Sequence, residues 1–188
     1  NEKHKVMPKK INLNPWYINQ GRKDLCIHGH FNRSRGFGIE DYYPHIKQAV
    51  TFLRDPLEIA LSNFHYSQKL ITNGKNFRNG KKFELTEDID EFLETKKPFV
   101  HLFLPKDLSK DNMEQILDDY FVHIGVIEHY QQSIDILADK LDKPKIKIVH
   151  KNISERLQKP SESSVKKYKS KCEFEYSLYN IALRENNI

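Results

Sequence analysis

Two histidines, His28 and His30, flank Gly29 in an apolar segment that spans residues 25–31. The composition of this segment predicts a short strand running into a loop, and residues two apart in a strand face the same side. Imidazoles titrate near neutral pH, so such a pair can exchange protons with a ligand that approaches closely over the glycine. The pair can also bind a metal ion, but no third ligand is evident nearby, and we predict no metal site.

A second candidate for chemistry lies around Arg54 and Ser62. Residues 49–53 form a short apolar run that predicts a buried strand, and Asp55 then suits the N-cap of a helix. Glu58, three residues after Asp55, completes a capping-box pattern, and the apolar residues at 57, 60, 61 and 64 predict the apolar stripe of that helix. A helix start of this kind attracts phosphate, and an arginine adds a bidentate donor. The same pattern also occurs in ordinary structural turns, so the spacing alone leaves both interpretations open.

Further strands and helices alternate along the rest of the chain. Apolar patterns predict strands over 122–127 and 145–150, and loops over 32–45 and 72–83. Helical spacing predicts a helix over 86–95 capped by Thr86, one capped by Ser109, one from Tyr130 and a long terminal helix from Ser161. This alternation predicts an α/β fold with a parallel sheet. Ligands in such folds bind at the carboxyl ends of strands, here after 25–31, at Arg54 and at 150–154.

Charge is distributed unevenly along the 188 residues, whose net charge is +5. Residues 1–54 carry ten basic and four acidic side chains, and residues 140–188 carry twelve basic and six acidic ones. The middle of the chain is acidic, because residues 55–139 carry nine basic and sixteen acidic side chains. Two basic ends that meet in the fold would suit phosphate, sulfate or a polyanion, although lysines commonly just solvate helix faces. No arginine-rich or aromatic-interleaved motif supports nucleic-acid binding, so we predict no nucleic-acid partner.

Length and composition bound the architecture further. We expect one domain over residues 1–188, with an irregular segment at 1–24 and a core at 25–188. Two cysteines are too few for a disulfide framework. No apolar run approaches the roughly 20 residues that a membrane helix needs, so we predict no membrane segment in this sequence.

Residues 51–66, which contain Arg-Asp-Pro followed by a helix and a serine, resemble the 3′-phosphate-binding motif of sulfotransferases. These enzymes use the donor 3′-phosphoadenosine 5′-phosphosulfate and release adenosine 3′,5′-bisphosphate. The resemblance implies that Arg54 and Ser62 bind the ribose 3′-phosphate. Many members carry another arginine where this chain has Ile59, and its loss removes a salt bridge or a substrate contact.

The resemblance continues in order over about residues 25–185. Residues 122–133 are similar to a core strand with its following helix, and residues 175–182 to the terminal helix of the carbohydrate branch. The His-Gly-His segment looks most like that of uronyl and heparan sulfate 2-O-sulfotransferases. It implies that His30 is the general base that takes the acceptor proton, with His28 as its partner or a second catalytic group.

Residues 150–160 resemble the late loop that closes over the nucleotide in this family. The resemblance implies contacts from Lys151, Asn152 and Ser154 to the nucleotide, with positive charge added by Arg156 and Lys159. An ordinary basic loop would show the same composition, so for each single residue both interpretations stay open.

The resemblance implies a P-loop-like three-layer fold with a central parallel sheet. The first strand, phosphate loop and helix of that fold are not identified: the Pro-Lys at residues 8–9 lacks the glycine and threonine that should follow. We therefore expect either a sulfotransferase whose first βα unit lies outside this sequence or a non-catalytic relative that binds a nucleotide or polyanion. A basic module that binds nucleic acid or another polyanion is a third hypothesis. The expected acceptor is a hydroxylated molecule, most simply a saccharide, in the cytoplasm of a bacterium or the Golgi lumen of a eukaryote.

Overall fold

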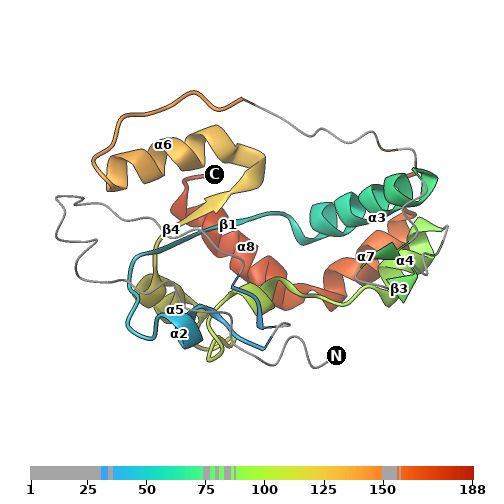
Figure 1. Cartoon of the computed structure of the whole chain (residues 1–188), viewed down its shortest axis with the longest axis horizontal. Coiled ribbons are helices and arrows are strands. Elements are labelled where there is room, and N and C mark those ends of the chain that lie inside the picture. The colour runs from blue at the N-terminus through green and yellow to red at the C-terminus, as the bar shows by residue number, and fades with distance from the viewer. Residues whose placement is uncertain are drawn as a thin grey trace. The chain divides into compact units, whose positions relative to one another are not determined.

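A computed structural model describes residues 31–33, 36–73, 77–78, 81–82, 86, 88–149, 156 and 158–188 (Figure 1). The chain divides into two compact units, Asn1–Ile46 with Phe99–Asn112 and Lys47–Pro98 with Met113–Ile188. The expectation of one domain over the whole chain stays a prediction. The strand predicted over 25–31 lies outside the described residues, apart from its last residue.

The first unit contains the short helix α2 (Ile39–Tyr42) and the 3₁₀ helix η3 (Val100–Phe103). The sequence predicted only loop and turn over 32–45, so α2 is an addition. Arg33 joins the two segments of the unit, because its guanidinium donates to the backbone carbonyls of His101, at 2.7 Å, and Leu104. Glu40 accepts from the backbone N–H of Lys106 at 2.9 Å and forms an ion pair with Arg33.

The second unit is built on two parallel strands, β1 (Ala49–Leu53) and β4 (Phe121–Val126). Both were predicted, β4 within one residue at each end. Gly125 pairs with Phe52 across the two strands, and a Cβ on Gly125 would lie 2.3 Å from the Phe52 ring, so glycine leaves the room that this ring occupies. A second, antiparallel pair, β2 (Phe77–Arg78) and β3 (Lys81–Lys82), falls in the segment predicted as a loop.

Helices cover this sheet and extend beyond it: α3 (Pro56–Thr72), α4 (Ile89–Thr95), α5 (Met113–Tyr120), η4 (Ile127–His129), α6 (Tyr130–Lys140), α7 (Glu162–Lys171) and α8 (Glu173–Glu185). Figure 1 shows α6 and α8 next to β4, and α3, α4 and α7 together. The predicted apolar stripe of α3 is confirmed. A buried core joins α3, α4 and α7: Ala60, Leu61, Phe64, Ile89, Leu93, Tyr168 and Cys172.

Three helix boundaries differ from the prediction. Asp88, not Thr86, caps α4, since its carboxylate accepts from the N–H groups of Asp90 and Glu91. Helix α5 begins at Met113, four residues after the predicted cap Ser109. The terminal helix is not continuous, because the backbone leaves the helical region at the fully buried Cys172, which separates α7 from α8.

The outer edge of β4 is satisfied by side chains. Lys140 donates to the carbonyl of Val122 at 3.0 Å, and Asn186 to that of Ile124 at 2.8 Å. Ser133 bonds both backbone groups of Val126. These bonds take the positions where a further strand would pair.

The strand predicted over 145–150 is wrong for its described residues, 145–149. The side-chain amide of Gln131, not a neighbouring strand, bonds the carbonyl of Ile146 and the N–H of Ile148. The alternation of apolar residues does not reflect burial, since Ile146 is 60% and Val149 73% exposed.

The described structure is therefore mixed α/β, mostly helical, with a small parallel sheet of two strands. Among the described residues, no helix is long and apolar enough to cross a membrane.

Candidate functional site

Two of the predicted site residues, Arg54 and Ser62, fall in the described part of the second unit. Arg54 follows β1 directly, at the carboxyl end of the parallel pair, and its side chain is 32% exposed. Ser62 is partly buried in α3. Arg156 and Lys159 of the predicted late loop are described and exposed, whereas five predicted residues lie outside the described residues: His28, His30, Lys151, Asn152 and Ser154.

The N-terminus of α3 is capped by its own sequence, as predicted. Oδ1 of Asp55 accepts from the N–H of Leu57 at 2.7 Å and from that of Glu58 at 3.1 Å. Pro56 occupies the first helical position and has no N–H to offer. The first-turn donors that usually attract phosphate are therefore already occupied, so an anion here would meet side chains instead.

The second half of the predicted capping box is not formed by Glu58. The N–H of Asp55 donates instead to Oε1 of Glu128, at 3.2 Å, from just beyond β4. This leaves the carboxylate of Glu58 facing two arginines. Glu128 replaces it at the cap because the carboxyl ends of the two parallel strands lie side by side.

Arg54 lies between these two carboxylates. Its Nη2 is 3.5 Å from Oε2 of Glu58, and its Nε is 3.6 Å from Oε1 of Glu128. Both distances exceed the roughly 2.7–2.9 Å of a strong charge-assisted hydrogen bond. The guanidinium is thus held from two sides but is not saturated by either carboxylate.

A second arginine reaches the same carboxylate from the late segment. Arg156 contacts both oxygens of Glu58 in a bidentate ion pair, one arm of which measures 3.0 Å. Its hydrogen bond is the main reason why the pKa of Glu58 is lowered, with smaller contributions from the charges of both arginines. Two guanidinium groups therefore converge on a single anionic centre at the start of α3.

One stripe of α3 faces the late segment. Glu58, Ser62 and His65 recur at four and three residues, so they share a helix face. His65 is buried, and its pKa is lowered by that burial and by the charge of Arg156, whereas the hydrogen bond from its imidazole to the backbone carbonyl of Gln158 raises the pKa. Ser62 therefore lies on the same face of α3 as Glu58, the residue that Arg54 and Arg156 both contact.

Two tyrosines of α8 bind the carboxylates at the strand ends. The hydroxyl of Tyr176 donates to Oδ1 of Asp55 at 3.1 Å, and that of Tyr179 to Oε2 of Glu128 at 3.0 Å. Burial, together with the neighbouring carboxylates, raises the pKa of both phenols. They remain neutral donors across the physiological pH range and fix the two acids.

Sequence reasoning did not assign roles to Glu128, Tyr176 or Tyr179. Residues 122–133 and 175–182 were singled out only as parts of the fold. Glu128 directly follows a predicted strand, and the tyrosines are three apart on a predicted helix, which was the available signal. Of the other histidines in this unit, His123 is buried, at 1% exposure, whereas His129 is exposed.

The net charge around Arg54 is less positive than the basic composition of the two ends of the sequence predicted. Among the described residues, Asp55, Glu58 and Glu128 oppose only Arg54 and Arg156. A phosphate placed here would compete with Glu58 for both guanidinium groups. No cluster of three His, Cys, Asp or Glu side chains suited to a metal ion occurs within the described part of the chain.

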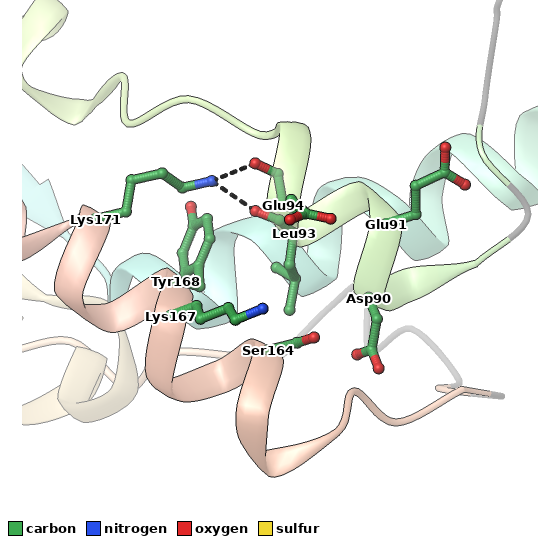
Figure 2. A pocket seen from close by; sticks show the side chains of 8 residues that line it. All are labelled: Asp90, Glu91, Leu93, Glu94, Ser164, Lys167, Tyr168 and Lys171. Carbon is green, nitrogen blue, oxygen red and sulfur yellow. Dashed lines mark hydrogen bonds between the residues drawn. The ribbon is translucent and has the colours of Figure 1, made fainter.

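A separate hollow lies between α4 and α7, with a volume of about 320 Å³ (Figure 2). We call it the α4–α7 pocket; its lining residues are Asp90, Glu91, Leu93, Glu94, Ser164, Lys167, Tyr168 and Lys171. Lys171 donates to the carbonyls of Leu93 and Glu94, at 2.7 and 2.8 Å, and so caps the end of α4. The carboxylate of Asp90 accepts from the N–H of Ser161 at 2.8 Å.

We compared the chain with protein-family models, with curated proteins and with solved structures, and none of the three comparisons gives a match. The resemblance of the motifs to sulfotransferases therefore stays a prediction.

Proposed function

We propose that this protein is a sulfotransferase that uses 3′-phosphoadenosine 5′-phosphosulfate and acts on a hydroxyl of a saccharide or similar acceptor. One observation carries the proposal: Arg54 lies at the carboxyl end of β1 directly before the capped helix α3, and Arg156 reaches the same helix face. This is the position at which α/β folds bind ligands. The parallel β1–β4 pair is consistent with a parallel sheet that continues on the β1 side, since side chains occupy the outer edge of β4.

In this proposal the 3′-phosphate of the donor binds Arg54 and Ser62 along the flank of α3. The long contacts of Arg54 leave its guanidinium able to form a bidentate pair with phosphate. Phosphate also draws Arg156 away from Glu58, because a dianion competes with one carboxylate for two guanidinium groups. Lys151, Asn152 and Ser154 would contact the rest of the nucleotide.

The proposed chemistry is transfer of one sulfuryl group. His30, assisted by His28, takes the proton of the acceptor hydroxyl as its oxygen attacks sulfur. The new oxygen–sulfur bond forms as the bond to the donor 5′-phosphate oxygen breaks, which gives a sulfate ester and adenosine 3′,5′-bisphosphate. Binding of the nucleotide without transfer would identify the non-catalytic relative instead.

The test is isothermal titration calorimetry with adenosine 3′,5′-bisphosphate. We expect Arg54→Ala to weaken binding by about 10- to 150-fold, since a charge-assisted hydrogen-bonded contact contributes roughly 1.5–3 kcal/mol. Arg184→Ala is a matched control, because Arg184 also pairs with a glutamate, Glu114, at 2.7 Å but lies elsewhere on the second unit. Adenosine 5′-monophosphate, which lacks the 3′-phosphate, should bind weakly to every variant.

Equal affinity of the wild-type protein and Arg54→Ala would contradict the site. So would the absence of binding to the wild-type protein. Loss of affinity in Arg184→Ala as large as in Arg54→Ala would mean that general charge, not this site, holds the nucleotide.

A further inference from the structure

Glu128 occupies the counterpart of Asp55 at the carboxyl end of the sheet. The register pairs Leu53 of β1 with Val126 of β4, so that two residues further along each chain come Asp55 and Glu128. The hydrogen bond from the N–H of Asp55 to Oε1 of Glu128, at 3.2 Å, extends the contact between the strands past their ends. The glutamate is thereby fixed beside the residue that directly precedes Asp55, which is Arg54.

The carboxylate of Glu128 is held at both oxygens. Oε1 accepts from the backbone of Asp55 and lies 3.6 Å from Nε of Arg54. Oε2 accepts from the hydroxyl of Tyr179, a residue that is only 9% exposed and therefore has little freedom to move. A carboxylate with these two fixed donors has a defined orientation, and its remaining charge is directed at the guanidinium.

We infer that Glu128 is a positioning residue for Arg54, a role that rests on the proposed function of Arg54 as the phosphate ligand. It lies against the Nε side of the guanidinium, while the Nη2 end reaches toward Glu58 and the stripe of α3 that carries Ser62. A guanidinium approached at Nε keeps its terminal nitrogens free for a bidentate anion. Tyr179 acts one step further away, by orienting Glu128.

The two glutamates near Arg54 then have opposite effects on an anionic ligand. Glu58 faces the terminal nitrogens and occupies Arg156, so it competes with a phosphate. Glu128 supports the other side of the same guanidinium. Simple electrostatics predicts that removal of either negative charge tightens anion binding. If Glu128 instead positions Arg54, removal of its charge weakens anion binding, whereas removal of the Glu58 charge still tightens it.

The experiment compares Glu128→Gln with Glu58→Gln in calorimetry with adenosine 3′,5′-bisphosphate, on the full chain. We expect Glu128→Gln to weaken binding about fivefold and Glu58→Gln to tighten it about threefold, effects of the size that partly exposed charge pairs produce. Tyr179→Phe should weaken binding about twofold. Tighter or unchanged binding in Glu128→Gln overturns the inference, and weaker binding than wild type supports it. The proposed function fails separately, if wild-type protein does not bind the nucleotide.

A second measurement decides the inference without any ligand. The ¹⁵N–¹H signal of the Arg54 Nε group is assigned as the one that disappears in Arg54→Lys. We expect Glu128→Gln to move this signal toward the position of exposed arginines, and Glu58→Gln to leave it near its wild-type position. An unmoved signal in Glu128→Gln overturns the inference even if the nucleotide binds. Thermal unfolding of each variant confirms that the fold is retained.

Discussion

The start of α3 and the α4–α7 pocket both join distant parts of the second unit through charged side chains, but they use the charges differently. In the pocket, Lys171 donates to two backbone carbonyls at 2.7 and 2.8 Å, which uses two of the three donors of the ammonium and caps a helix. At the start of α3, Arg54 lies 3.5 and 3.6 Å from two carboxylates. Short bonds to the backbone stabilise packing, whereas long contacts between side chains leave charge for a ligand.

The two regions also differ in what surrounds the charge. Leu93 and Tyr168 beneath the pocket belong to the buried core that joins α3, α4 and α7. At the start of α3 the arginines share a carboxylate that is itself about one-third exposed. Changes at the pocket should therefore alter stability alone, and changes at Arg54 should alter binding alone.

The largest expected effect is on the core under the pocket. Leu93 is 1% exposed, and Leu93→Ala should lower the free energy of unfolding by about 2–5 kcal/mol, because a buried leucine leaves a cavity when truncated. Urea unfolding followed by circular dichroism measures the loss. Leu141 is 46% exposed, so Leu141→Ala should change the free energy of unfolding by less than about 0.5 kcal/mol. Equal losses of unfolding free energy in the two variants would contradict the assignment of Leu93 to the core.

A smaller effect is expected from the cap of α4. Lys171→Met keeps the apolar stem but loses both hydrogen bonds to the carbonyls, and should cost about 1–2 kcal/mol of unfolding free energy. Lys167→Met is the matched control, since Lys167 lines the same pocket but forms no hydrogen bond to the other residues drawn in Figure 2. Neither variant should change nucleotide affinity. A change in affinity on Lys171→Met would mean that the two regions are coupled.

The smallest effect concerns pH. The pKa of Glu58 is lowered from its ordinary value of 4.5, chiefly by the hydrogen bond from Arg156. The stabilisation by this ion pair is therefore complete above about pH 4.5 and is lost as pH falls through the lowered folded-state pKa. We expect wild type to be more stable than Glu58→Gln by less than about 1 kcal/mol at pH 7, and the difference to vanish in acid. Urea unfolding at pH 7 and pH 3 measures this.

The Arg156→Gln background provides the control for the pH prediction. Without Arg156, Glu58→Gln should produce a much smaller difference between the two pH values. A pH-dependent difference of the same size in both backgrounds would show that another partner lowers the pKa of Glu58.

Local signals in the sequence predicted the elements that carry Arg54. The apolar run at 49–53, the cap at Asp55 and the stripe of α3 depend only on neighbouring residues, and the structure confirms them. The same kind of local pattern favours a cap of α4 at Thr86, but the carboxylate of Asp88, two residues later, accepts from the first free N–H groups of the helix. The His28–His30 pair and the late loop stay predictions.

The arrangement around Arg54 depends on contacts that no local pattern encodes. Glu128 and Tyr176 meet Asp55 across 73 and 121 residues of chain. The strand predicted at 145–150 failed for a similar reason. Its alternating pattern is local, but the structure gives the edge of β4 to the side chains of Lys140, Ser133 and Asn186.

The side chains along the edge of β4 have a consequence for the behaviour of the protein in concentrated solution. An unpaired strand edge is a template for pairing with another copy of a chain, and native proteins protect such edges. Here a lysine, a serine and an asparagine occupy backbone groups of β4, and the lysine adds a charge at the rim. The hydrogen bonds of these three side chains give β4 a built-in barrier against intermolecular β-pairing, and with it against aggregation through this strand.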